Sequence, residues 1–340
     1  MIESSRCAVI AEVGLNHNGE FELARRSIVA AAEAGADGVK FQNFRTEDFL
    51  VDRSLTLTYR NRGETITEPL YDICKRCEMR KGWIAPLSEL CRELGIEFLS
   101  TPTSEQGVMD LVRAGCRYVK NGSDYLTHTP LLRFMAETGL TVIISTGMAD
   151  TADIDDAMKA VERAAPDRVI LLHCTSSYPT APEHTNLRRM ASLRERYGVR
   201  VGFSDHTEGW QAASQAASLG AVLVEKHFTL DRDLPGPDHW FSTTPDELST
   251  LVTEVRRAET RMGSAALTPA ASELATKDDW RIGVVAARRL AVGDLLTGDD
   301  VAFRKPATGI LPRELDRWIG RRLAVAVADN EPLRPEHFAP

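Results

Sequence analysis

The sequence predicts an α/β fold, a (β/α)8 barrel of the TIM type followed by a small β-rich domain. Up to His227, eight short apolar runs rich in β-branched residues recur, and segments of helical periodicity separate most of them. This alternation indicates parallel β/α units, and eight units in about 250 residues is the usual size of such a barrel. The even repeat contains no G-x-G-x-x-G turn, which favours the barrel over an open doubly wound sheet.

The expected elements follow one another at regular intervals. The predicted strands are 8–13, 38–42, 96–100, 118–120, 142–145, 169–173, 201–204 and 222–227. The predicted helices are 20–34, 104–114, 130–138, 154–164, 211–219 and 245–262. Gly35 and Gly115 follow the first two of these helices as expected C-caps, because glycine readily adopts the left-handed conformation there.

One interval interrupts this rhythm. Residues 44–81 are long, polar and charged, and they follow the second predicted strand. A long loop at this point leaves the end of the barrel where active sites form, so we expect either an active-site loop or a surface excursion that makes a dimer contact.

The pattern changes after Met262. Residues 264–281 are rich in Ala, Ser and Thr and are expected to be a linker. Short runs with β character then follow at 283–287, 300–303 and 323–328, separated by turns. We therefore expect a catalytic barrel domain at 1–263 and a second domain at 282–340.

Composition excludes several classes of function. The chain of 340 residues is 43% hydrophobic and 26% charged, with a formal net charge of −8, so neither a nucleic-acid binder nor a membrane-surface binder is expected. No apolar window is long enough to span a bilayer and no signal peptide is evident, which predicts a cytoplasmic protein with reduced thiols. Cys74 and Cys77 have CxxC spacing, but a lone pair does not indicate a metal or redox site.

Polar residues end all eight predicted strands. In a barrel these ends meet at one face, where chemistry collects. Lys40 and Lys120 are cations at the ends of buried strands, where lysine is rare without a partner. Together with nearby hydroxyl groups they suit a phosphorylated anion. The alternative pairs each lysine with a barrel carboxylate such as Glu12. The hydroxyl groups belong to Thr101, Ser123, Ser145, Thr175, Ser176 and Ser204.

His206 and His227 end the seventh and eighth predicted strands. Neighbouring strands lie about 4.8 Å apart, so the two imidazoles can share one cation. The oxygen-rich surroundings favour Mn²⁺ or a similar ion, with Mg²⁺ and Co²⁺ as alternatives, over structural Zn²⁺. Each histidine taken alone is equally consistent with a hydrogen-bonded core residue. The pair favours a metal that polarises a carbonyl group.

Several motifs occur in a distinctive order. They are EVGLNHNG, VKFQ, STP, ISTGM, LLHCTSSYPT, FSDHT, EKHFTLD and PGPDHWFS, and they resemble those of the sialic acid (N-acetylneuraminate) synthase family, which includes legionaminate and pseudaminate synthases. The segment 284–312 is similar to the SAF (antifreeze-like) domain that follows the barrel in this family. The resemblance implies a TIM barrel and a SAF domain.

The resemblance also implies a reaction and a set of residues. The reaction joins phosphoenolpyruvate to an N-acyl amino sugar such as N-acetylmannosamine, giving a nine-carbon 2-keto-3-deoxy acid and phosphate. His206 and His227 would be the metal ligands. The phosphoenolpyruvate site would contain Lys40, Thr101, Lys120, Ser123, Ser145, Ser176 and Ser204. Glu12, Gln42, Tyr178, Glu225 and Asp238 would face the metal or the sugar, and the catalytic groups would be Glu12, Asp124, Glu225 and Lys120.

The sequence departs from the family pattern at three positions. Tyr125 stands where the family usually has glutamate, so we expect the preceding Asp124 to manage the attacking water. Ser176 stands where many members have asparagine. Lys305 aligns with an arginine of the SAF domain that contacts the acyl group of the sugar. Lysine lacks the planar fork of arginine, so the sugar preference is expected to differ.

In the resembling family the SAF domain crosses to a second subunit, so a domain-swapped homodimer is expected. Two other functions remain as alternatives from the residues alone. One is a sugar aldolase with a Schiff-base lysine at Lys40 or Lys120. The other is a non-catalytic carbohydrate-binding or ice-binding protein. The sequence identifies neither the amino sugar nor its phosphorylation state.

Overall fold

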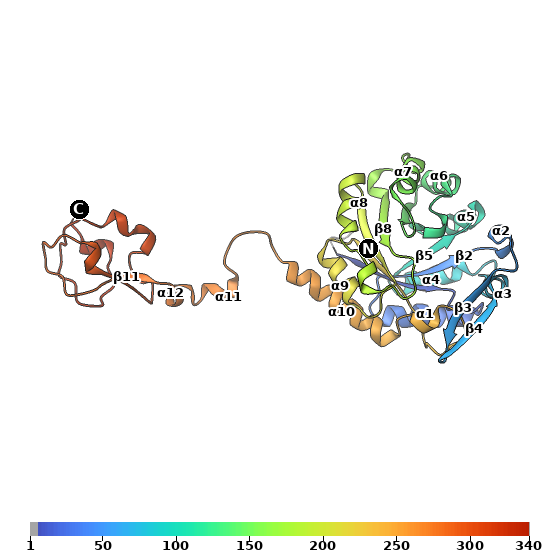
Figure 1. The fold of residues 1–340 in the computed structure, drawn as a ribbon, viewed down its shortest axis with the longest axis horizontal. Helices are drawn as coiled ribbons and strands as arrows, with labels where there is room; N and C mark the ends of the chain where they lie inside the picture. Colours follow the sequence, from blue (N-terminus) through green and yellow to red (C-terminus); the bar gives the residue numbers. More distant parts are fainter. Residues whose placement is uncertain (1–5, 340) are drawn as a thin grey trace. The chain divides into compact units, whose positions relative to one another are not determined.

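A computed structural model describes residues 6–339, and the chain forms two compact units, one ending at Gly263 and the other beginning at Ser264. The first unit is a parallel barrel that contains all eight predicted strands (Figure 1). The strands are β1 (Ala8–Gly14), β2 (Gly38–Asn43), β5 (Glu97–Pro102), β6 (Tyr118–Asn121), β7 (Thr141–Ser145), β8 (Val169–Cys174), β9 (Arg200–Asp205) and β10 (Leu223–His227).

The strands are hydrogen-bonded in the order β5-β2-β1-β10-β9-β8-β7-β6. The end strands β5 and β6 contact each other, so the sheet is a nearly closed barrel. Alternate side chains point inward, and apolar ones fill the barrel below its mouth, the end at which the C-termini of the strands meet. These inner residues are Ala8, Ile10, Leu99, Tyr118, Ile143, Ile170, Leu172 and Leu223. This largely apolar layer lies below the polar strand ends at the mouth.

Helices cover the outside of the barrel through their apolar faces. They are α1 (Phe21–Glu33), α4 (Ile84–Glu93), α5 (Glu105–Arg113), α6 (Thr129–Glu137), α7 (Thr151–Ala160), α8 (Arg189–Tyr197), α9 (Gln211–Ser218) and α10 (Pro245–Met262). The sequence analysis did not predict α4 and α8. The apolar signal of α8 is weak, since only Met190 and Leu193 of this helix are buried.

The interval 44–81 contains its own secondary structure. Helix α2 (Thr46–Phe49) precedes a hairpin of β3 (Thr56–Asn61) and β4 (Glu64–Pro69), and α3 (Leu70–Arg76) follows it. Arg62 and Gly63 form the turn, both with positive φ. The hairpin tip contacts the loop after β10, because Asn61 Nδ2 donates to the carbonyl oxygen of Leu234 at 2.8 Å. The interval is therefore an ordered wall beside one side of the barrel mouth.

The second unit has a small core of its own. Strands β11 (Gly283–Ala286) and β12 (Val301–Arg304) pair antiparallel, and Val284, Leu296 and Leu333 are among the buried residues. The prediction of a strand at 323–328 was wrong. Only isolated bridges form there, Leu323 with Phe338 and Val327 with Leu290, because the chain bends between them.

The expected linker is partly ordered. Residues 264–281 contain α11 (Ala271–Leu274) and α12 (Lys277–Trp280). The amide of Ala307 donates to the carbonyl oxygen of Asp278 at 2.9 Å, so the end of this segment packs with the second unit. Short 3-10 helices occur in loops throughout the chain: η1 (Ser123–Tyr125), η2 (Pro166–Arg168), η3 (Pro182–His184), η4 (His239–Phe241), η5 (Gly298–Asp300), η6 (Pro312–Arg317) and η7 (Pro335–His337).

A search of residues 6–339 finds no helix with the length and apolar character to cross a membrane. All six cysteines are buried free thiols. Burial raises the pKa values of Cys74 and Cys77 to about 11, so both are protonated at neutral pH.

Candidate active site

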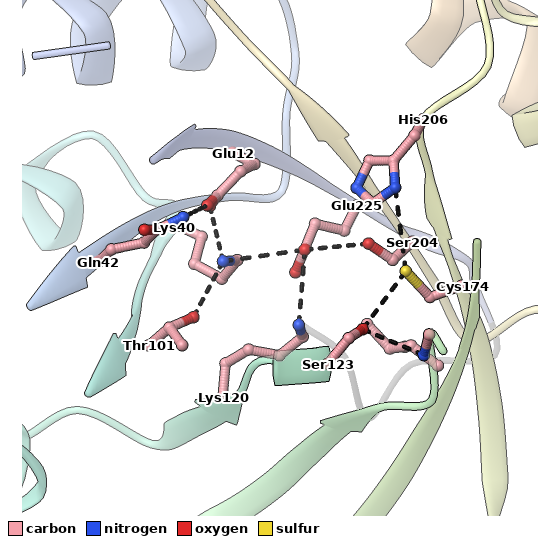
Figure 2. Close-up of polar contacts among 12 residues, drawn as sticks. Glu12, Lys40, Gln42, Thr101, Lys120, Ser123, Cys174, Ser204, His206 and Glu225 are labelled. Atoms are coloured by element: carbon pink, nitrogen blue, oxygen red, sulfur yellow. Dashed lines mark hydrogen bonds and ion pairs between the residues drawn. The ribbon is translucent and has the colours of Figure 1, made fainter. Parts of the chain in front are cut away.

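Two lysines and two carboxylates form a buried ionic network at the barrel mouth (Figure 2). Lys40 Nζ lies 2.8 Å from Glu12 Oε2 and 3.8 Å from Glu225 Oε1. Lys120 Nζ lies 3.6 Å from the same oxygen of Glu225. Strand register produces this contact, because Glu12 on β1 pairs with Lys40 on β2 and with His227 on β10. Glu225 thus lies between two buried cations.

The ionisation of these groups depends on burial and on their neighbours. Burial opposes the charge of Lys40, but Glu12 and then Glu225 outweigh it and raise the pKa. Burial lowers the pKa of Lys120, and Glu225 compensates only in part. Burial raises the pKa of Glu12, as expected for a proton-transfer group. The two lysines outweigh burial at Glu225 and lower its pKa. The network therefore holds charges that an incoming anion can rearrange.

Hydroxyl groups surround the lysines. Lys40 Nζ donates to Thr101 Oγ1 at 3.0 Å, and Ser204 Oγ donates to Glu225 Oε1 at 3.2 Å. The amide of Gly147 donates to Ser123 Oγ at 3.1 Å. Ser145 Oγ is buried and has no hydrogen-bond partner among the described residues. An unpaired buried hydroxyl at the end of β7 indicates a place for a polar ligand.

A glycine keeps part of this region open. A Cβ atom at Gly147 would lie 2.3 Å from Ser176 Oγ and 2.7 Å from Ser123 Oγ. A side chain at position 147 would clash with both hydroxyl groups, so glycine lets Ser123 and Ser176 approach the backbone there. The structure thus brings all seven residues expected around phosphoenolpyruvate to the barrel mouth: Lys40, Thr101, Lys120, Ser123, Ser145, Ser176 and Ser204.

The rings of His206 and His227 lie next to each other, with centroids 5.4 Å apart. His206 Nδ1 is 2.8 Å from the carbonyl oxygen of Thr175, which favours a proton on Nδ1 and leaves Nε2 as a lone-pair donor. His227 Nδ1 is buried without a hydrogen-bond partner, and burial lowers the pKa of this imidazole, so it is neutral. The orphaned Nδ1 of the neutral His227 ring, next to the Nε2 lone pair of His206, fits a divalent cation.

The described residues contain no group of three or more His, Cys, Asp or Glu side chains arranged around one metal position. A cation held by His206 and His227 would therefore keep coordination positions for substrate or water. This donor set suits an ion such as Mn²⁺ better than a closed structural zinc site.

The residues expected to face the sugar lie beside the histidines. The ring of Tyr178 packs on His206 with centroids 4.1 Å apart. Asp238 Oδ2 lies 3.7 Å from His227 Nδ1, and burial, followed by the charge of Glu12, raises the pKa of Asp238 to about 7. Gln42 Nε2 donates to Glu12 Oε1 at 3.2 Å. These groups form a second, more aromatic side of the mouth.

Two expected residues stand apart from the others, Asp124 because it forms no ion pair with a described residue and Lys305 because it belongs to the second unit. The charge of Asp124 is nonetheless close enough to act on the pKa of Lys40. Its neighbour Tyr125 stacks on His128 at 5.7 Å. Lys305 belongs to the second unit, where its Nζ lies 4.7 Å above the ring of Trp280.

Sequence reasoning missed two residues of the mouth. The ring of Phe241 lies 5.1 Å from that of His227 and 5.3 Å from that of Tyr178. Cys174 Sγ lies 3.9 Å from His206 Nδ1 and accepts from Ser123 Oγ at 3.6 Å. Cys174 ends β8, so the strand-end argument already pointed to it. Phe241 lies in a loop and is recognisable only through its closeness to Asp238 in the sequence.

Comparison with known proteins agrees with this geometry. The model of the NeuB family matches residues 27–266, and the SAF domain model matches residues 282–339. The chain belongs to the NeuB family. It is an enzyme, a phosphoenolpyruvate-dependent synthase of the nonulosonic (sialic-acid-type) acids, with a C-terminal SAF domain. Family membership favours this activity over both alternatives, the Schiff-base aldolase and the carbohydrate- or ice-binding protein.

Individual relatives differ in the product that they are named for. The chain is 38% identical to the N,N'-diacetyllegionaminic acid synthase of Legionella pneumophila, over 98% of this chain and 95% of that protein. It is 30% identical to the human N-acetylneuraminate-9-phosphate synthase, over 97% and 92% of the two chains. The crystal structure of a sialic acid synthetase from Leptospira borgpetersenii in complex with citrate has a TM-score of 0.71 and 33% identity, covering 80% of this chain and 90% of that one. Family members generally depend on a metal.

Proposed function

We propose that this enzyme condenses phosphoenolpyruvate with the open-chain aldehyde of an N-acyl hexosamine. C3 of the enolpyruvate bonds to the aldehyde carbon, water adds at C2, and the C2–O bond to phosphate breaks. The products are a nine-carbon 2-keto-3-deoxy sugar acid and inorganic phosphate. The observation that carries this proposal is the pair of buried lysines, Lys40 and Lys120, next to two neighbouring histidine rings in one barrel mouth.

The lysine side of the mouth binds phosphoenolpyruvate. Its carboxylate and phosphate bring negative charge to Lys40 and Lys120, whose only described carboxylate partners are Glu12 and Glu225. Thr101, Ser123, Ser145, Ser176 and Ser204 donate to the remaining oxygens. The orphaned hydroxyl of Ser145 gains its missing partner in this complex.

The histidine side of the mouth binds the aldehyde end of the sugar. His206 and His227 would hold a divalent metal, most suitably Mn²⁺, which as a Lewis acid polarises the aldehyde carbonyl. Tyr178 presents its ring to the sugar chain, while Gln42 and Asp238 contact its hydroxyl groups. Asp238, with a pKa of about 7, is partly protonated at neutral pH and can donate as well as accept.

Carboxyl groups donate and accept the protons of the reaction. Glu12 has a raised pKa and lies between Lys40 and Gln42, so it is suited to protonate the alkoxide that forms at the former aldehyde. Glu225 stays ionised between the lysines and holds them in place. Asp124 is the group that we assign to the attacking water, since Tyr125 occupies the usual glutamate position.

The active site is completed by a second subunit. Lys305, on the SAF domain of one chain, contacts the acyl group of a sugar in the barrel of the other, in a domain-swapped homodimer. Residues 264–281 join the two units. An extended chain covers about 3.3 Å per residue, so even with the short helices α11 and α12 the segment has the length to cross to a neighbouring subunit.

Release of inorganic phosphate from phosphoenolpyruvate tests this function. The acceptor panel contains N-acetylmannosamine, its 6-phosphate and 2,4-diacetamido-2,4,6-trideoxyhexoses, each with Mn²⁺, Mg²⁺ and Co²⁺. We expect metal- and acceptor-dependent release with at least one sugar, and mass spectrometry should show the nine-carbon acid. If no acceptor in this class stimulates release, the proposed reaction is wrong.

A further inference from the structure

A pocket rich in arginine lies outside the network described above. It encloses about 430 Å³ between the tip of the β3–β4 hairpin and the loop that follows β10. We call it the arginine pocket, and its lining residues are Arg60, Arg62, Gly63, Arg232, Asp233 and Trp240. Three of these six residues are cationic and only one is acidic, in a chain whose formal net charge is −8.

The contacts of the arginines leave positive charge available. Arg60 and Arg62 form no ion pair with a carboxylate among residues 6–339. Arg62 Nε instead donates to the backbone carbonyl of Asp233 at 3.0 Å, and the Arg60 guanidinium lies 5.8 Å from the ring centre of Trp240. Arg232 has a carboxylate partner, Glu247, at 2.6 Å. Two guanidinium groups of the pocket therefore keep their capacity for an external anion.

The rigidity of both walls favours a built site over a chance cluster. The hairpin tip is tied to the opposite loop by the Asn61–Leu234 hydrogen bond. That loop is fixed in turn by Arg232 Nε, which donates to the carbonyl oxygen of Ser242 at 2.9 Å. Planar guanidinium groups held in this way match the oxygens of a phosphate group in bidentate geometry.

The arginine pocket begins next to the acceptor side of the barrel mouth. The Trp240 ring packs edge-on against Phe241 with centroids 5.5 Å apart, and Phe241 lies 5.1 Å from the ring of His227. Trp240 and Phe241 are successive residues of η4. A single pair of aromatic rings thus separates the histidine side of the mouth from the arginines.

We propose that the arginine pocket is a phosphomonoester-binding site. Two sources of this group are compatible with its place: the phosphate on the far end of a phosphorylated acceptor sugar, or a separate phosphorylated molecule beside the mouth. The first source rests on the function proposed above, whereas binding itself does not depend on it.

Location of the anion is the first test. Crystals of the full chain are soaked in tungstate, a heavy mimic of phosphate, and anomalous difference maps are calculated. We expect a peak in contact with Arg60 and Arg62 in the wild-type protein. The barrel lysines provide an internal reference, because they should bind tungstate too. A peak at the lysines without one at the arginines would overturn the proposal, and this readout needs neither turnover nor a variant.

Kinetics with two acceptors identify the source. The double variant R60Q/R62N removes both charges, and asparagine tolerates the positive φ of 49° at position 62. The matched control R133A/R188A removes two exposed arginines on the distant helix α6 and at the start of α8. The quantity compared is the KM for N-acetylmannosamine 6-phosphate divided by the KM for N-acetylmannosamine.

If the pocket binds the phosphate of the acceptor, this KM ratio rises at least about tenfold in R60Q/R62N and stays unchanged in the control. An unchanged ratio together with a tungstate peak assigns the pocket to a separate phosphorylated molecule. If no acceptor of the panel supports phosphate release, the proposed function fails while the tungstate result still decides the arginine pocket.

Discussion

Lys40 and Glu12 form an ion pair inside the barrel, with 2.8 Å between Nζ and Oε2 and neither side chain more than 4% exposed. Removing one partner of a buried pair leaves an uncompensated charge, which typically costs about 3–5 kcal/mol. Here Glu225, at 3.8 Å from the lysine, moderates that cost. An incoming phosphoenolpyruvate molecule would compensate the same lysine.

We therefore predict that Glu12→Gln lowers the free energy of unfolding at pH 8 by about 1–3 kcal/mol, measured by urea denaturation. Phosphoenolpyruvate should restore more stability to the variant than to the wild type. The control Asp155→Asn breaks a surface pair with Arg196 and should cost less than about 1 kcal/mol. Equal losses in both variants would show that burial of the pair has no energetic consequence.

The metal assignment is testable without turnover. His206→Ala should abolish tight Mn²⁺ binding and reduce turnover at least about a hundredfold. Electron paramagnetic resonance of the free ion measures the binding. The barrel should stay folded, because the Thr175 carbonyl can be hydrated at the mouth. His184→Ala, an exposed histidine, is the matched control. Full activity of the wild type in excess chelator would contradict the assignment.

Lys120 distinguishes the two sides of the mouth. Its only described carboxylate partner is Glu225, and its charge lies on the side assigned to phosphoenolpyruvate. Lys120→Ala should weaken phosphoenolpyruvate binding about 10- to 100-fold, since a charge-assisted contact contributes about 1.5–3 kcal/mol, with little effect on the KM of the sugar. Calorimetric titration measures the first quantity, with Lys159→Ala on the surface of α7 as control. If only the KM of the sugar changed, Lys120 would belong to the subsite that binds the sugar.

Much of this architecture could be predicted because it depends on local patterns. The eight strands are buried apolar runs, and parallel strands bring their C-terminal ends together, so Lys40, Lys120, His206 and His227 had to share one mouth. Pairing of each lysine with a barrel carboxylate such as Glu12 was an open alternative to anion binding, and the structure shows ion pairs with Glu12 and Glu225.

Other features depend on contacts between distant segments and gave no local signal. The β3–β4 hairpin lacks a clear apolar face, because five of the six residues of β3 are exposed or half-buried. The position of Phe241 against His227 results from the path of a loop. The run at 323–328 has the composition of a strand, but its residues find only single bridging partners.

The SAF domain contains a carboxylate with a predictable pH dependence. Asp300 accepts from the amide and hydroxyl of Thr297 at 2.9 and 2.7 Å and pairs with Arg288 at 2.6 Å. Burial opposes its ionisation, but these contacts outweigh burial and lower its pKa. The folded pKa is then below the unfolded value of about 3.9. Asp300 therefore contributes stability above that value, and the contribution is lost as the pH falls through the folded pKa.

We predict that Asp300→Asn destabilises the SAF domain at pH 7, with faster hydrogen exchange in peptides covering 283–304, and that the difference from the wild type shrinks below about pH 4. The exposed neighbour Asp299 provides the control variant Asp299→Asn, which should exchange like the wild type. A difference that persists unchanged at pH 3 would contradict a role for the ionised carboxylate.

The last prediction concerns the shared active site of the proposed homodimer. A chain truncated after Gly263 retains the barrel as a compact unit, with the lysines, carboxylates and histidines of the mouth. It should still bind Mn²⁺ and phosphoenolpyruvate but lose most sugar-dependent turnover, because Lys305 and the covering domain are missing. Undiminished turnover of the truncated barrel would show that the SAF domain has no catalytic part.

Mixed dimers decide whether the domain acts on its own barrel or on that of its partner. One chain carries His206→Ala in the barrel, and the other carries Lys305→Ala in the SAF domain. In a swapped dimer, the intact barrel of the second chain receives the intact domain of the first, so half of the dimers in an equal mixture contain one complete site. Refolding the mixture should then restore about a quarter of the wild-type activity. If each domain served its own barrel, every site would lack one essential residue and mixing would restore nothing.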